Sequence, residues 1–232
     1  MRRGGMPLLA VVWCAACGQR AGQEDEPYAP IIDPAQFTET VDNRFFPLVP
    51  GTSFYYQERR GSERVEVHVT ADRKEIMGVP CVVVRSREYD GAELIEETLD
   101  WYAQDREGNV WYFGEDTKAY KSGAVVSTEG SWEAGRDGGL PGIIMPGSPQ
   151  VGQRYRQEYS KGHAEDMGEV MRLGESRGVP YGTFADVLVT KDWTPLERGM
   201  SERQYYAPGV GLILEAGGLQ RVELLRVTVD AR

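Results

Sequence analysis

Val65-Glu66-Val67-His68-Val69-Thr70 alternates apolar and polar residues with a period of two. This alternation is typical of a β-strand with one buried face and one exposed face. Residues 93–103 repeat the pattern, and we expect their apolar side chains to face the core and their polar side chains to face solvent. The apolar set is Ile95, Leu99 and Trp101, and the polar set is Glu96, Thr98 and Asp100.

Turn residues separate these runs along most of the chain, as in Asp90-Gly91, Glu107-Gly108-Asn109 and Ser122-Gly123. No long stretch has the period of an amphipathic helix. A final strand is predicted over 220–229, with a bulge at Leu224-Leu225 because the apolar residues change face there. The sequence therefore predicts an all-β, antiparallel fold.

An internal repeat organises the predicted strands. Gly78-Val79-Pro80 and Gly178-Val179-Pro180 lie 100 positions apart. Similar segments flank both motifs in the same order, and the matched pairs are 50–58 with 151–158, 82–85 with 187–190, and 100–103 with 204–207. We interpret 48–113 and 150–216 as two tandem copies of a unit of four to five strands. Their apolar faces would pack together as a sandwich or as one strongly curved, barrel-like sheet.

The N-terminus has the pattern of an export signal. A basic start, Met1-Arg2-Arg3, precedes an apolar run over 6–16, whose 11 residues are too few for a membrane-spanning helix. Cys14-Ala15-Ala16-Cys17 resembles the cleavage box of bacterial lipoproteins, which implies removal of 1–16 and a lipid on Cys17. Ordinary cleavage after Ala16, giving a secreted protein without a lipid, is the alternative.

The mature chain is acidic. Loss of Arg2 and Arg3 changes the formal net charge from −10 to −12, which disfavours nucleic acid as a partner. Residues 17–43 are polar and carry several prolines, so we expect a flexible tether. Residues 44–232 would form a single β domain. Cys81, the cysteine left after processing and lipidation, is expected to be a small buried hydrophobic residue.

Several motifs resemble those of an uncharacterised family of bacterial exported lipoproteins. They are Trp101-Tyr102-Ala103, the run 108–118 (GNVWYFGEDTK), 128–135 (TEGSWEAG), 141–146 (PGIIMP) and 205–212 (YYAPGVGL). The last motif is similar to a hairpin of exported lipoproteins with a curved sheet of the Lol-carrier kind. The resemblance implies a location in the cell envelope, anchored by the lipid, at an outer membrane if the host has one. It implies no activity.

Residues 114–149 separate the two copies and form a predicted insertion that is rich in loops. Aromatic and acidic side chains gather within and around it, and such a mixture suits a sugar, a cationic group or an amphiphile. The candidate ligand-binding residues are Trp101, Tyr112, Glu115, Asp116, Trp132, Glu133, His163, Glu165 and Asp166.

No established catalytic motif is present. The leading hypothesis is a non-enzymatic envelope protein that binds a small or amphiphilic ligand, or a partner protein, at the end covered by 114–149. One alternative is a glycoside-type hydrolase that uses two of the candidate carboxylates, and another is a structural envelope component with an apolar patch around Ile143-Ile144-Met145. We expect no cofactor, although converging carboxylates would suit Ca²⁺. Two histidines are too few for an ordinary zinc site.

Overall fold

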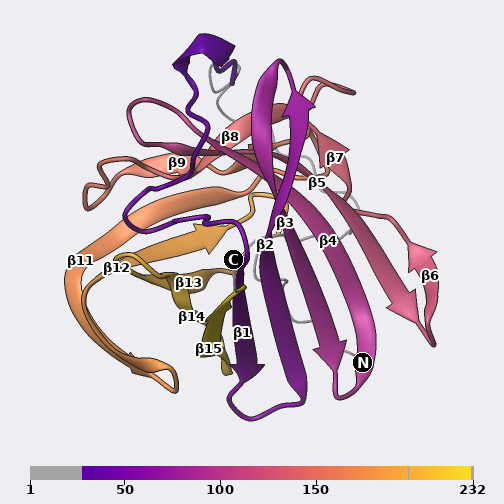
Figure 1. Cartoon of the computed structure of the whole chain (residues 1–232), viewed down its shortest axis with the longest axis vertical. Helices are drawn as coiled ribbons and strands as arrows, with labels where there is room; N and C mark the ends of the chain where they lie inside the picture. The colour runs from indigo at the N-terminus through magenta and orange to yellow at the C-terminus, as the bar shows by residue number, and fades with distance from the viewer. Residues whose placement is uncertain (1–27, 198, 231–232) are drawn as a thin grey trace.

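The computed structural model describes residues 28–197 and 199–230. The predicted signal peptide and Cys17 lie outside these residues. The described chain folds into one 15-stranded antiparallel sheet that curls into a nearly closed barrel (Figure 1). The all-β prediction is confirmed, and of the two predicted arrangements the curved sheet is the one formed. No helix of the described residues is long and apolar enough to cross a membrane.

The first half of the barrel is a meander in which each strand pairs with the next. Its strands are β1 (Thr52–Glu58), β2 (Glu63–Ile76), β3 (Val79–Asp90), β4 (Glu93–Gln104) and β5 (Val110–Lys121). They run side by side across the front of Figure 1. The paired ends of β2 and β3 extend beyond the barrel as an arm, because a bulge between Val69 and Arg73 shifts their register.

The second half is a similar meander that continues into the last strand. It contains β9 (Arg154–Arg156), β11 (Met167–Val179), β12 (Gly182–Trp193), β13 (Glu202–Ala207), β14 (Gly211–Gly217) and β15 (Gln220–Val229). β15 pairs with β1 and joins the halves, and its register skips Leu225, which confirms the predicted bulge. The origin of the halves by duplication stays a prediction. Gly78 lies in the β2–β3 turn, whereas Gly178 lies within β11, so the two motifs sit at equivalent hairpins but are offset.

The segment between the halves is more regular than predicted. β5 continues through Gly114 to Lys121, so the predicted boundary at 114 falls inside a strand. β6 (Ala124–Ser127), β7 (Trp132–Glu133) and β8 (Leu140–Met145) all pair with β5. β10 (Glu158–Tyr159) then pairs with β8 while β9 pairs with β11, so 154–159 nearly closes the barrel.

The predicted flexible tether is too long, because residues 28–43 pack on the barrel. The Tyr28 hydroxyl donates to the Pro141 carbonyl at 2.8 Å, and Phe37 makes an edge contact with Phe113. Val41 is buried. A short 3-10 helix, η1 (Pro34–Gln36), begins after Asp33. The apolar residues among the prolines make these contacts. They are too few to change the overall polar composition of the segment, from which the tether was predicted.

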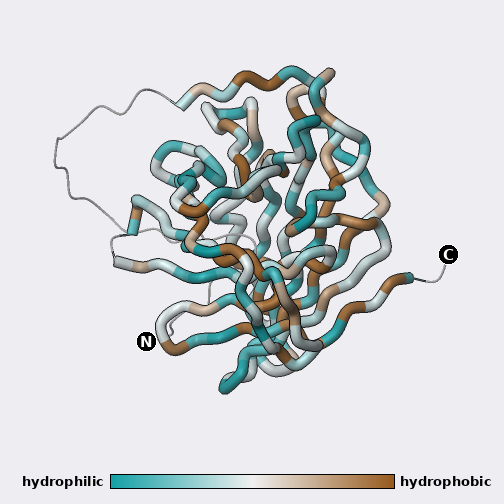
Figure 2. The backbone as a smooth tube through the Cα atoms, turned by 90° about the vertical axis from the view of Figure 1, so that its left-hand side faces the viewer, coloured by the Kyte–Doolittle hydropathy of each residue, from teal (hydrophilic) through white to brown (hydrophobic). Residues whose placement is uncertain are grey.

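The core lies inside the barrel and between the barrel and the segments that cross it. Among the described residues, hydrophobic and hydrophilic residues alternate along much of the backbone, without a long, uniformly hydrophobic stretch (Figure 2). Cys81 is fully buried, as predicted. Burial raises the pKa of its thiol, so this cysteine is unreactive in the folded protein.

Candidate ligand-binding site

The interior of the barrel is polar where β4 and β5 line it. Thr98 and Asp100 are buried at 2% and 0% exposure, whereas Leu99 between them is half-buried on the outer face. The expected orientation of β4 is therefore wrong, since its polar face points inward. The reason lies in the neighbouring strands. Asp100 pairs with Glu115 of β5, and this row of polar side chains forms a common face inside the barrel.

Three buried carboxyl groups, Asp100, Glu115 and Glu158, form what we call the interior acid cluster. Each accepts one hydrogen bond from a neighbouring side chain. The Tyr112 hydroxyl donates to Asp100 Oδ1 at 2.8 Å, the Thr117 hydroxyl to Glu115 Oε2 at 2.6 Å, and Trp132 Nε1 to Glu158 Oε2 at 3.1 Å. Among the described residues, no lysine or arginine forms an ion pair with the cluster.

Burial without a counter-charge changes the protonation of the cluster. Loss of hydration raises the pKa of Asp100 to about 8, and Glu96 nearby adds to the rise. Burial, with Asp100 and Glu158 beside it, raises the pKa of Glu115 well above its ordinary value. Burial and neighbouring carboxylates also raise the pKa of Glu158. Burial therefore favours the protonated form of each group, because an unpaired carboxylate is costly in a dry interior.

Five aromatic rings cross the barrel beside the interior acid cluster, and we call them the aromatic row. In order they are Tyr206, Phe46, Tyr102, Tyr112 and Trp132, with successive ring centroids 6.4, 5.3, 4.9 and 5.6 Å apart. The row connects β13 of the second half with β7 of the insertion. Aromatic faces together with carboxylates are the combination that binds cationic nitrogen groups in proteins.

Tyr102 joins the acid cluster to a cavity. Its hydroxyl is fully buried and has no hydrogen-bond partner among the described residues. Burial and the nearby carboxyls of Asp100 and Glu115 raise its pKa well above the ordinary value, which places the hydroxyl in the field of the cluster. An unsatisfied buried hydroxyl costs about 1–3 kcal/mol. A bound ligand that supplied the missing hydrogen-bond partner would recover this cost.

The cavity beside Tyr102 is apolar and holds about 40 Å³. Its wall combines the inner faces of β1–β3, the segment 46–48 and the β13–β14 hairpin at 210–212. Val84 lines it and pairs directly with Asp100 across β3 and β4. The apolar wall of the cavity therefore lies next to the buried carboxyl group of Asp100.

A second group of carboxyls lines the other half of the barrel. Asp192 and Glu215 are both 5% exposed. Burial raises the pKa of Asp192 to about 6 and, with Glu202 and Glu88 beside it, raises the pKa of Glu215 well above its ordinary value. Carboxyls therefore line much of the interior, on both halves.

The structure brings three of the predicted residues together. Tyr112, Glu115 and Trp132 all contribute to the interior acid cluster or the aromatic row. The β5–β7 pairing places Glu115 opposite Trp132, and the Tyr112 and Trp132 rings meet edge to face at 5.6 Å.

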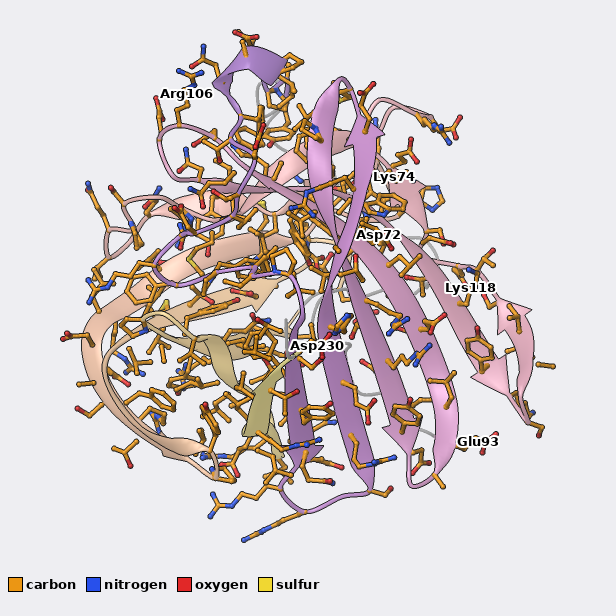
Figure 3. The ribbon with its side chains drawn as sticks, in the orientation of Figure 1. Asp72, Lys74, Glu93, Arg106, Lys118 and Asp230 are labelled. Carbon is orange, nitrogen blue, oxygen red and sulfur yellow. The ribbon has the colours of Figure 1, made fainter. Side chains whose placement is uncertain are left out.

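Three other predicted residues lie outside the barrel interior. Asp116 faces outward on β5, with its side chain 41% exposed and bonded to Lys118 at 3.1 Å. Trp101 lies under the arm, with Lys74 Nζ 3.2 Å from its ring centroid. Lys74 also donates to Glu133 at 2.6 Å. Figure 3 labels Lys74 on the arm and Lys118 near β6. The charges of these two lysines are compensated by Glu133 and Asp116.

The remaining predicted residues occupy the turn before β11. His163 is exposed, and Glu165 accepts a hydrogen bond from the Gly162 amide. Asp166 is partly exposed and lies near Asp192 and Glu202. Its backbone and its carboxyl group also lie beside Glu158 of the interior acid cluster. No three histidine, cysteine or acidic residues of the described ranges are grouped so that they could hold a metal ion. The Ca²⁺ hypothesis gains no support from this geometry.

The site also contains residues that the sequence did not indicate, namely Phe46, Asp100, Tyr102 and Glu158. The alternation along residues 93–103 puts Asp100 on the polar face, and the polar face of a half-buried strand usually faces solvent. A signal was nevertheless available. Asp100-Trp101-Tyr102 is part of one of the repeated segments, and only five residues separate it from the run 108–118 that supplies Tyr112 and Glu115.

No family model matches the chain, and no curated protein is significantly similar to it. Among solved structures, the chain is similar to a candidate lipoprotein from Parabacteroides distasonis, at 13% sequence identity and a TM-score of 0.43. The alignment covers 81% of this chain and 100% of that protein. A TM-score below 0.5 does not establish a common fold, and the similarity assigns no activity to this chain.

Proposed function

We propose that the chain is an exported binding protein, anchored to the cell envelope through a lipid on Cys17, whose barrel binds a ligand with a cationic nitrogen and a short apolar body. The cationic nitrogen would lie between the interior acid cluster and the aromatic row. The apolar body would enter the cavity lined by Val84 and Leu212. The cavity would widen on binding, because its volume of about 40 Å³ is well below the roughly 150 Å³ of a cavity that binds benzene. This assignment makes the ligand an amphiphilic amine, which is one of the chemistries expected from the sequence.

The observation that carries the proposal is the buried, unpartnered hydroxyl of Tyr102 beside Asp100 and Glu115. A structural core would satisfy these groups or replace them with hydrocarbon, since unsatisfied buried polar groups are costly. An ammonium group donates several hydrogen bonds and carries the charge that the interior lacks. It would satisfy Asp100 Oδ2, which also has no partner among the described residues.

Binding would exchange protons for the ligand. In the empty barrel Asp100 carries a proton at neutral pH because its pKa is raised to about 8. An ammonium group nearby lowers a carboxyl pKa, so the proton leaves as the ligand enters. The affinity is therefore highest between about pH 8 and the pKa of the amine, and it falls as the pH decreases below 8 because the proton on Asp100 competes with the ligand.

The alternatives have less support from the geometry. The hydrolase hypothesis needs two of its five carboxylates in one pocket, but Asp116, Glu133 and Glu165 lie at the surface or in ion pairs. The remaining two, Glu115 and Asp166, have different neighbouring carboxyls and do not shift each other's pKa. The structural-component hypothesis needs an exposed apolar patch on β8. Ile143 and Ile144 instead pack against the core, and Met145 is fully buried.

Calorimetric titration of the purified protein at pH 8 with n-butylamine, n-butanol and butanoate tests the proposal. We expect butylamine alone to bind, and Asp100→Asn to weaken it about 10-fold or more, since a hydrogen bond to a charged group contributes about 1.5–3 kcal/mol. Asp116→Asn removes a carboxylate from the outer face of the same sheet and should leave the affinity unchanged. Equal binding of butanol and butylamine would contradict the assignment of a cation site.

The lipid anchor is tested separately. Mass spectrometry of the mature N-terminus should show a diacylglycerol-modified Cys17, and Cys17→Ala should abolish the modification. An unmodified mature chain would refute the anchor and leave the binding proposal untouched.

A further inference from the structure

The outer wall of the barrel contains a second hollow, on the opposite side of the sheet from the apolar cavity. It holds about 120 Å³ and is lined by β1, β2 and β3. The side chains that face it are Ser53, Tyr55, Glu66, His68, Arg85 and Arg87. These residues alternate with the buried residues of the same strands, so they belong to the outer face.

We propose that this hollow binds a phosphoryl oxyanion, with Arg85 as its principal ligand. Arg85 is half-buried in the middle of β3, where it pairs in register with His68. It forms no ion pair or side-chain hydrogen bond with any residue that the structure describes. A guanidinium held in a concave site without a partner presents its planar donors to a ligand, and phosphate oxygens match that fork.

The surroundings supply further donors. Ser53 Oγ and His68 Nδ1 lie 2.8 Å apart, so one group already orients the other toward the hollow. Tyr55 forms the adjacent wall, and the Arg226 guanidinium carbon lies 3.8 Å from the centroid of its ring. Hydroxyl, imidazole and guanidinium groups in one site match the several oxygens of a phosphoryl group better than the two of a carboxylate.

The local charge also favours an anion. Arg87 is compensated by Glu97 at 2.5 Å, and Glu66 opposes it across β2 and β3. Among the residues that line the hollow, Arg85 and Arg87 carry two positive charges and Glu66 carries one negative charge. The hollow is thus a locally cationic place on a protein whose formal net charge is −10. An anion repelled elsewhere on the surface is attracted here.

Titration of the full-length protein with inorganic phosphate and glycerol 3-phosphate, followed by amide NMR shifts, tests the site. We expect binding that Arg85→Gln weakens about 10-fold or more, and that Arg85→Lys, which keeps the charge but loses the fork, partly restores. Arg64→Gln is the matched control. Arg64 lies on the same face of β2 as His68, with its guanidinium over the Tyr89 ring and outside the hollow. Its loss should therefore change the affinity less than 2-fold.

A second arm identifies the source of the phosphoryl group. Vesicles of phosphatidylglycerol are compared with the soluble phosphates. Vesicle binding that depends on Arg85, without binding of the soluble compounds, assigns the site to a lipid headgroup, whereas binding of the soluble compounds assigns it to a free metabolite. Absence of binding in both arms, or equal losses with Arg85→Gln and Arg64→Gln in proteins of unchanged thermal stability, would overturn the proposal.

Discussion

Replacing Asp100 with asparagine should make the protein more stable at alkaline pH, in contrast to the usual cost of removing a buried charge. Asp100 is 0% exposed, and its pKa is raised from 3.8 in the unfolded chain to about 8 in the fold. A carboxyl group with a raised pKa stabilises the fold fully below the unfolded value, and this contribution is lost as the pH rises to the folded value. Asparagine has a similar shape and no proton to lose.

The magnitude follows from the proton count. Between pH 5 and pH 8 the folded state holds about one more proton at Asp100 than the unfolded state, which changes the unfolding free energy by about 1.4 kcal/mol per pH unit. Over three pH units, wild-type protein should lose about 4 kcal/mol relative to Asp100→Asn. The hydrogen bond from Tyr112 to Oδ1 survives in the variant, because the amide oxygen also accepts.

Urea unfolding at pH 5, 6, 7 and 8, followed by tryptophan fluorescence, measures this difference. Any pH-independent cost of placing an amide at position 100 cancels. The prediction concerns only how the difference in unfolding free energy between variant and wild type changes with pH. Asp116→Asn is the control, because its exposed side chain should give a difference independent of pH. A constant difference for Asp100→Asn across the range would refute the reasoning, since Asp100 would then be ionised in the fold.

Three further predictions concern the site and its frame. Tyr102→Phe removes an unpartnered hydroxyl, so thermal unfolding should show unchanged or higher stability while calorimetry shows weaker butylamine binding; a large loss of stability would mean that the hydroxyl has a structural partner. Gly114→Ala should cost about 1–3 kcal/mol, because its φ is +120° and a Cβ would lie 2.3 Å from the Trp132 carbonyl oxygen, whereas Gly178→Ala, which lacks both features, should cost less in the same urea assay. Leu224→Ala should cost about 2–5 kcal/mol, since the residue is fully buried at the bulge of β15; a cost below 1 kcal/mol would contradict the packing of β15.

The strands of this fold could be predicted because their periodicity is local. The alternation at Val65, Val67 and Val69 identified β2 and its buried face, and the change of parity at Leu224-Leu225 identified the bulge. Closure of the sheet was harder to foresee. It depends on a short segment at 154–159 that pairs with β11 on one side and β8 on the other, and no single strand pattern encodes two partners.

The site could be predicted only in part, because alternation shows that two faces differ and does not show which one is inside. On β4 the half-exposed residue is Leu99, and the buried ones are Thr98 and Asp100. A barrel interior that contains carboxyls reverses the usual rule that the apolar face is inward. Tyr112 and Trp132 were identified through their aromatic character, while Glu158 became visible only when β10 placed it beside Trp132.

Infrared spectroscopy in D₂O near neutral pH tests the protonated carboxyls of the barrel interior most directly, because a protonated carboxyl group has a carbonyl band distinct from that of a carboxylate. We predict such a band in the folded wild-type protein and a smaller band in Asp100→Asn. Addition of butylamine should decrease the band of the wild-type protein. A folded protein without this band, with all its carboxyls ionised, would contradict the account. The interior would then already contain the positive charge that a ligand is proposed to bring.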